Sequence, residues 1–326
     1  MTFDNLLIIP TMRNFPGWSK FDSCRGIDKF DIIIIGEDQN TVPEIQRAYF
    51  FGAAERKEWM KDKGLEKFME AVPEKSRAEL NFALVYAYFN GYEKCIIIDD
   101  DIEPLNSDFF EDHLALLFDG LHPVAENRWI NVIKETGLYP RGYPYNARYM
   151  HSTSMSQCDV VLNQGLWYNY LDLNAQEYMT NRMRVEYGDP EQHFVVPMDT
   201  YTTVCGMNLS FKTEIAPAFY QFPRKRYDDI WSGLVLKKVL DALAKSMSFG
   251  IPYCRHKKFP RSLAKDAIYE MEHHDENEKL WLSLDLLELN GSDYLSCMDE
   301  ILHGIKWDDD IWNSLKVWVD LWNQIM

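Results

Sequence analysis

The stretch Cys95-Ile96-Ile97-Ile98-Asp99-Asp100-Asp101 passes from residues typical of a buried strand directly into three carboxylates. A strand interior cannot hold unpaired charge, so the acidic triplet is expected where the strand ends and the sheet opens to solvent. If the chain stays extended there, Asp99 and Asp101 point the same way and Asp100 points the other way. The stretch therefore predicts an α/β sheet with an acidic site at the carboxyl edge of one strand.

Two carboxylates that converge at this edge provide the hard oxygen ligands that Mg²⁺ or Mn²⁺ prefers. Such an ion usually keeps some of its waters and binds the phosphates of a substrate as well. We therefore interpret Asp99 and Asp101 as metal-ligand candidates. The alternative is a solvated acidic loop, but the apolar strand before the triplet and the helix before that strand favour a site.

The segments at the start of the chain have the pattern of a nucleotide-binding α/β sheet. Residues 6–9 and 31–35 are short apolar strands, and each is followed by a polar loop. These loops supply three candidates for contacts with a nucleotide, namely Thr11, Arg13 and Asp38.

A helix is predicted over residues 80–88, where apolar side chains recur at helical spacing. Ser76 and Glu79 have the spacing of a capping box in front of it, and the acidic strand follows directly. The remaining expected elements are helices over residues 43–71, 109–118 and 228–243, and strands over residues 129–133, 159–162, 195–197 and 204–211.

The totals limit the classes of partner. The chain has 326 residues, 46% of them hydrophobic, and a net charge of −17. An acidic surface argues against nucleic acid and anionic membrane as general partners, although a metal and local arginines can reverse the field within one cleft. The six cysteines form no CxxC pair, so no zinc or redox motif is expected. No signal peptide and no membrane span are predicted, and we expect a soluble cytoplasmic protein.

Three further segments carry candidate site residues. Residues 139–148 contain two prolines and one glycine, which predicts either a loop over a ligand or an ordinary crossover, and Arg148 lies at its end. Asp228 and Asp229 follow three cations at the start of a helix, where they suit either a site or the helix dipole. His256 follows a short apolar piece and is either a third metal ligand or a structural histidine.

The end of the chain changes character. We expect one domain over residues 1–270 and a helical tail over residues 271–326. Apolar residues of the tail form a seam at coiled-coil spacing: Ile311, Leu315, Trp318, Trp322 and Ile325. The seam must pack on the core or on a second subunit, and we lean toward a homodimer formed through the tail.

Seven short motifs occur in a fixed order between about residue 8 and about residue 258. They are Ile9–Asn14 (IPTMRN), Ile98–Asp101 (IDDD), Arg141–Arg148 (RGYPYNAR), Gly165–Trp167 (GLW), Cys205–Phe211 (CGMNLSF), Arg226–Trp231 (RYDDIW), and Pro252-Tyr253 followed by His256. Together they resemble the reversibly glycosylated polypeptides, the UDP-arabinopyranose mutase family of plants and their microbial relatives. Residues from about 275 to 326 have no recognised counterpart, and residues 40–75 are poorly matched. Lys257-Lys258 stand where plant members have Ser-Lys.

The resemblance implies a GT-A type nucleotide-diphospho-sugar transferase fold, with a mixed, mostly parallel sheet flanked by helices. It also implies a divalent cofactor, Mn²⁺ or Mg²⁺. Asp99 and Asp101 match the family's metal motif, Asp100 becomes a sugar contact, and His256 becomes the third metal ligand.

The resemblance implies further roles for individual residues. Trp167 and Asn208 lie in family motifs and become candidates for contacts with a UDP-sugar. Arg148 matches the family's self-glycosylated arginine. A guanidinium is an awkward nucleophile because its pKa lies above about 12, so we interpret Arg148 chiefly as a clamp on the diphosphate. Asp228 or Asp229 would stabilise the sugar cation or orient its hydroxyls.

Three activities fit these residues. The first is a nucleotide-sugar mutase that interconverts the pyranose and furanose forms of a UDP-sugar. The second is a glycosyltransferase with an external acceptor, and the third is a non-catalytic subunit that binds sugar nucleotides. A phosphohydrolase is disfavoured, because Pro10-Thr11 stand where its nucleophilic aspartate would follow the first strand.

Overall fold

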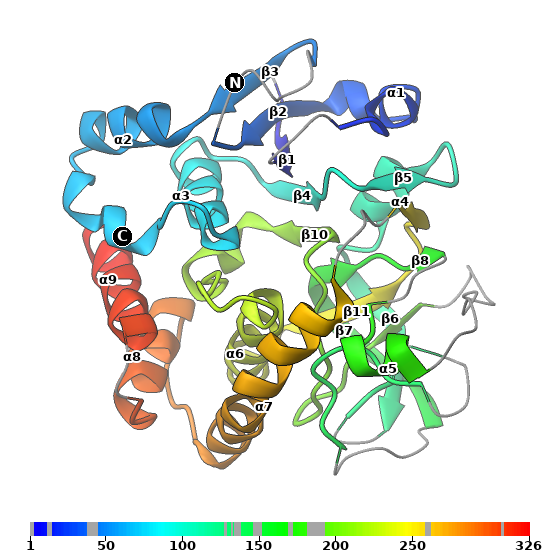
Figure 1. Ribbon diagram of the computed structural model, residues 1–326, viewed down its shortest axis with the longest axis vertical. Coiled ribbons are helices and arrows are strands. Elements are labelled where there is room, and N and C mark those ends of the chain that lie inside the picture. The colour runs from blue at the N-terminus through cyan, green and yellow to red at the C-terminus, as the bar shows by residue number, and fades with distance from the viewer. Residues whose placement is uncertain are drawn as a thin grey trace.

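The computed structural model of the protein describes residues 3–11, 15–37, 45–126, 129–131, 133, 138–145, 152–168, 172–180, 193–257, 262–307 and 310–326. Within these ranges, nine strands form one large sheet in the order β11-β9-β6-β7-β10-β4-β1-β2-β3, and three short strands form a second sheet in the order β5-β12-β8 (Figure 1). The strands of the large sheet are β1 (Asn5–Pro10), β2 (Phe30–Ile35), β3 (Ala48–Phe51), β4 (Lys94–Ile98), β6 (Asp119–Glu126), β7 (Ser152–Gln164), β9 (His193–Val195), β10 (Asn208–Lys212) and β11 (Ser246–Gly250). The strands of the small sheet are β5 (Ile102–Pro104), β8 (Trp167–Tyr168) and β12 (Cys254–His256).

The helices and 3-10 turns flank the large sheet. Before β6 they are α1 (Trp18–Phe21), η1 (Ile27–Lys29), α2 (Ala53–Asp62), η3 (Glu66–Ala71), η4 (Arg77–Glu79), α3 (Leu80–Phe89) and α4 (Phe109–Ala115). After β8 they are α5 (Ala175–Thr180), η6 (Thr213–Ala218), α6 (Asp228–Ala242), α7 (Leu263–Leu286), α8 (Tyr294–Gly304) and α9 (Asp310–Ile325). Helix α3 packs on β1 and β2, and α6 packs on β11. No helix within the described ranges has both the length and the apolar composition to cross a bilayer.

The first half of the sheet places the acidic triplet. Strands β3, β2, β1 and β4 run parallel, and β10 then pairs with β4 in the antiparallel sense. The apolar residues of β1 and β4 are fully buried, as expected for strands covered on both faces. The α/β fold predicted from the sequence, a mixed sheet flanked by helices, is confirmed, and the half of the sheet beyond β4 mixes both strand directions.

Two expected elements differ in the structure. Residues 43–71 were expected to be helical, but Ala48–Phe51 forms the edge strand β3, and α2 begins only after Gly52. Aromatic side chains favour strands, which explains why this short piece pairs with β2. Residues 129–133 were expected to be a strand, but the described residues there show only an isolated bridge between Trp129 and Tyr201.

The tail packs on the rest of the same chain. Helices α7, α8 and α9 gather beside α6 at one side of the molecule (Figure 1), and the expected domain boundary at residue 270 falls inside α7. Leu315, Trp318 and Trp322 are completely buried. The indole Nε1 of Trp318 donates to the carbonyl oxygen of Pro217 at 2.8 Å. The seam that favoured a dimer through α9 is thus covered by the chain itself, so α9 caps the core.

Candidate functional site

The three carboxylates of the triplet turn to different partners at the end of β4. The hydroxyl of Thr11, just after β1, donates to Asp100 at 2.8 Å. Nε2 of His256 lies 3.4 Å from a carboxylate oxygen of Asp101. The strand ends at Ile98 and the triplet enters a turn, so strict strand alternation does not govern these side chains.

A cavity of about 570 Å³ opens beside the triplet. Asp99 and Asp100 line one part of it, together with Thr11 at the end of β1 and Ile35 at the end of β2. The lining also contains four cationic side chains, Lys75, Arg77, Arg224 and Lys225. The cavity wall therefore combines four carboxylates with four cations, a local balance that the net charge of −17 does not suggest.

Arg77 connects Asp99 in the cavity wall to the backbone of Gly206. Its Nη1 lies 3.0 Å from one carboxylate oxygen of Asp99, and its Nη2 donates to the carbonyl oxygen of Gly206 at 2.5 Å. A Cβ added at Gly206 would lie 2.2 Å from that Nη2, so the guanidinium needs a glycine there. Burial raises the pKa of Asp99, Arg77 lowers it, and the nearby Asp101 raises it again.

The two acidic residues at the start of α6 occupy different environments. Asp228 is half-buried and lines the cavity. Burial, followed by the charge of Asp229, raises the pKa of Asp228 to about 7. Asp229 does not line the cavity. Its carboxylate accepts a hydrogen bond from the backbone N–H of Gly206 at 3.0 Å and pairs with Arg141 at 3.1 Å.

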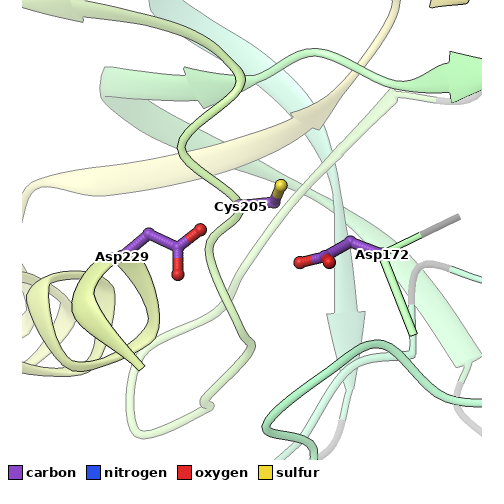
Figure 2. Close-up of side chains that lie close together, drawn as sticks. All are labelled: Asp172, Cys205 and Asp229. Atoms are coloured by element: carbon purple, nitrogen blue, oxygen red, sulfur yellow. The ribbon is translucent and has the colours of Figure 1, made fainter. Parts of the chain in front are cut away.

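Arg141 forms the centre of a buried ionic cluster. It pairs with Asp172 at 2.8 Å on one side and with Asp229 on the other. Figure 2 shows the carboxylates of Asp172 and Asp229 facing each other across the thiol of Cys205. Among the residues that the structure describes, only these three offer metal-ligand atoms within 4.8 Å of one another. Because Arg141 already pairs with both carboxylates and burial raises the pKa of the thiol, the cluster fits a structural role better than a metal site.

Of the metal ligands expected from the sequence, Asp99 lines the cavity, whereas Asp101 and His256 are not among its lining residues. Asp99, Asp101 and His256 offer two oxygens and one nitrogen, a donor set that suits Mn²⁺. Their ligand atoms do not all lie within 4.8 Å of one another, because the described part of the chain has only the Asp172 group at that spacing. Asp99 would have to turn from Arg77 toward the Asp101–His256 pair to complete the set.

The geometry can be compared with known proteins. The sequence model of the family described as reversibly glycosylated polypeptide matches residues 86–325. The chain belongs to this family. The match includes the tail, which the sequence motifs had left without a counterpart.

Members of the reversibly glycosylated polypeptide family among the curated proteins match over part of their length. UDP-arabinopyranose mutase 1 of Oryza sativa subsp. japonica is 31% identical over 187 residues, which are 53% of this chain and 50% of the relative. UDP-arabinopyranose mutase 1 of Arabidopsis thaliana is 31% identical over 155 residues, 45% of this chain and 42% of the relative. The chain thus spans about half the length of the curated relatives it matches. A solved mannosyltransferase of Pyrobaculum calidifontis in complex with GDP-Man and Mn²⁺ matches 98% of this chain and 69% of its own, with 12% identity and a TM-score of 0.43.

Two residues of family motifs lie behind the cavity and do not line it. Asn208 is fully buried on β10, where its Oδ1 lies 2.7 Å from Nε2 of His113 and its Nδ2 donates to the carbonyl oxygens of Leu166 and Pro252. Trp167 is 1% exposed. The hydrogen bonds of Asn208 and the burial of Trp167 indicate structural roles, and the contact of either residue with a nucleotide stays a prediction.

Three expected site residues, Arg13, Asp38 and Arg148, lie outside the residues that the structure describes.

Sequence reasoning missed two residues of the region, Arg77 and Arg141. Arg77 stands inside the expected capping segment and Arg141 opens the RGYPYNAR motif of the family. Their basic character was the available signal, but their acidic partners come from distant parts of the chain.

Proposed function

We propose that the protein is a metal-dependent nucleotide-sugar mutase, similar to UDP-arabinopyranose mutase, that interconverts pyranose and furanose forms of a UDP-sugar. The observation that carries the proposal is the cavity at the carboxyl ends of β1 and β4, which Asp99 and Asp100 line together with Lys75, Arg77, Arg224 and Lys225. In open α/β sheets this edge is where nucleotides bind. Membership of the family supports the same reading.

Asp99, Asp101 and His256 would hold the divalent ion. Oxygen ligands suit both Mg²⁺ and Mn²⁺, and the imidazole favours Mn²⁺. When bound, the ion supplies positive charge to the diphosphate as the sugar–phosphate bond breaks. Arg77 and the other cations of the cavity would hold the diphosphate in place while the sugar is detached.

Asp228 is the residue best placed for proton transfer. A mutase must remove a proton from the hydroxyl that closes the new ring and return one to the oxygen of the old ring. A carboxyl group with a pKa of about 7 can hold and release a proton near neutral pH. Self-glycosylation at Arg148, and its role as a diphosphate clamp, are parts of the proposal that rest on the family motif.

The proposal is tested by incubating the protein with a panel of UDP-sugars and Mn²⁺ and identifying the products by NMR. A ring-isomerised nucleotide is the expected result, and Asp101→Asn should abolish it. Free UDP formed only with an added acceptor would indicate a glycosyltransferase instead, and binding without turnover would indicate a sugar-nucleotide-binding subunit. The cytoplasmic location belongs to the proposal as well and is tested by cell fractionation.

A further inference from the structure

Helix α7 has one face fixed against the chain. Asn277 donates to the carbonyl oxygen of Gly142 at 3.2 Å, and the hydroxyl of Tyr227 donates to the carbonyl oxygen of Glu270 at 3.3 Å. Leu280 and Leu284 are completely buried on the same face. These contacts fix the rotation of the helix and therefore which residues it presents outward.

The outward face carries a row of large apolar side chains. Ile268, Met271, Leu282 and Leu286 are 56%, 76%, 42% and 83% exposed. Asp275 and Lys279 lie between the two apolar pairs and are exposed as well. These six residues, which we call the α7 stripe, follow one another at intervals of three or four and so share one helix face. Surface apolar residues scattered singly need no explanation, but such a row on one face marks an interaction site.

The order of residues in the α7 stripe is complementary to itself. From its start it contains two apolar residues, an acid, a base and two apolar residues. If a second copy of the helix is laid against it in the opposite direction about Asn277, Ile268 meets the partner's Leu286, and Met271 comes beside the partner's Leu282. Asp275 then faces the partner's Lys279, and this pairing occurs twice. A parallel arrangement would instead bring like charges together.

We propose that the α7 stripe is an antiparallel interface between two copies of this chain, related by a two-fold axis. The inference does not depend on the proposed catalytic function. The sequence had suggested self-association through the seam of α9, but that seam is buried within the chain. The α7 stripe takes its place as the self-associating surface. A helix of 24 residues is about 36 Å long, which makes this a small interface, so we expect dissociation in the micromolar range.

The charge of the whole chain predicts how association responds to salt. Each copy carries a net charge of −17, so two copies repel each other at long range. Added salt screens that repulsion, whereas the apolar contacts of the α7 stripe are not weakened by it. Association should therefore become stronger as NaCl is added.

The first test is sedimentation equilibrium of the full chain over a series of concentrations. The wild type should dimerise at micromolar concentration, and Ile268→Glu and Leu286→Glu should each weaken the dimer at least tenfold. Leu121→Glu is the matched control, because Leu121 is 66% exposed on β6, outside α7. A wild type that stays monomeric would overturn the proposal, and so would a dimer that both α7 variants leave intact.

The second test exchanges the charges. Asp275→Lys and Lys279→Asp should each weaken self-association, while a mixture of the two variants should form a heterodimer and the double variant should associate like the wild type. The positions are exposed, so circular dichroism should show unchanged folding in all of them. An Asp275→Lys variant with wild-type self-association, or a mixture that forms no heterodimer, would show that the two copies do not meet in this register.

Discussion

At the residue scale, Arg77 is the side chain that opposes the effect of burial on the Asp99 carboxyl. It is the cation closest to Asp99, and Gly206 provides the space in which its guanidinium lies. The ion pair opposes the effect of burial on the Asp99 carboxyl. Arg77, which also lines the cavity, thus offsets part of the rise in the pKa of Asp99 that burial causes.

Replacing Arg77 with alanine should shift the pH dependence of metal binding. Without the guanidinium, burial and Asp101 raise the pKa of Asp99 unopposed, so more alkaline solution is needed to ionise it. We expect the midpoint of Mn²⁺ binding to move to higher pH. Electron paramagnetic resonance of free Mn²⁺, titrated at a series of pH values without nucleotide, measures this. Arg77→Lys is the control, and an unchanged midpoint in the alanine variant would remove Arg77 from this role.

Asp228→Asn should make the protein more stable at neutral pH and less active. The pKa of Asp228 is about 7 in the folded chain, against 3.8 as the ordinary value. A group whose pKa is raised by folding loses its stabilising contribution as pH rises, here between about pH 4 and about pH 7. An asparagine at this position does not ionise, so the variant does not lose this stability. Above about pH 7 its free energy of unfolding should exceed that of the wild type by on the order of 2 kcal/mol.

Calorimetric melting of both proteins at a series of pH values measures the difference for Asp228. The two curves should meet near pH 4 and separate as pH rises. Equal melting temperatures at neutral pH would show that the Asp228 carboxyl is not under this strain.

The residue scale also shows which parts of the site could be predicted. The position of Asp99 and Asp100 followed from the sequence, because charge cannot stay inside a buried strand. The sequence could not show which of Asp228 and Asp229 lines the cavity, because adjacent residues of a helix point about 100° apart. Arg141 and the backbone N–H of Gly206, both distant from Asp229 in the sequence, hold that carboxylate away from the cavity.

At the element scale, prediction succeeded where burial alone sets the pattern. Strands β1, β2 and β4 are continuous apolar runs, and they were found from the sequence. Strand β6 was missed because it contains a glycine and a proline and alternates weakly. Its pairing with the long strand β7 makes it a strand. Tertiary partners, which the local sequence does not contain, decide such cases.

The seam of α9 shows the same limit. Its spacing correctly indicated an apolar face that must be covered, but spacing does not name the covering surface. In the structure that surface is Tyr88, Pro217 and Tyr220 of the same chain.

Trp318→Ala should therefore destabilise the folded chain itself. The indole is completely buried and donates a hydrogen bond to the carbonyl oxygen of Pro217. Truncation of a buried tryptophan costs about 3–5 kcal/mol. Urea unfolding followed by circular dichroism measures the change, with Met326→Ala, 63% exposed at the chain end, as the control. A variant as stable as the wild type would contradict the packing of α9 described above.

At the scale of the whole molecule, the two ends of the described chain are parts of one core. Helix α9 packs against η3 and contacts α3 through Trp322 and Tyr88, while α8 packs against η6. The residues buried on α9 include Trp312, Leu315, Trp318, Leu321 and Trp322. Apolar residues of the tail and of the large sheet therefore belong to one hydrophobic core.

A chain that ends at residue 309 should fail to form a cooperative native state. Burying each large apolar side chain contributes about 1.5–3 kcal/mol, so the loss of α9 approaches the whole stability of a typical domain, about 5–15 kcal/mol. Near-UV circular dichroism and thermal melting of the truncated chain should show no cooperative transition. A truncated chain that melts cooperatively and keeps its near-UV spectrum would make α9 an optional appendage.

The packing of α9 against the N-terminal half has a consequence for biosynthesis. Tyr88 and the neighbouring apolar surface of η3 leave the ribosome long before the last helix is made. At typical elongation rates the delay is on the order of tens of seconds. Throughout that time the nascent chain presents an uncovered aromatic surface in the crowded cell. Chaperone binding to ribosome-bound chains should therefore persist until α9 emerges from the ribosome, and that emergence becomes the event that allows the aromatic surface to be covered.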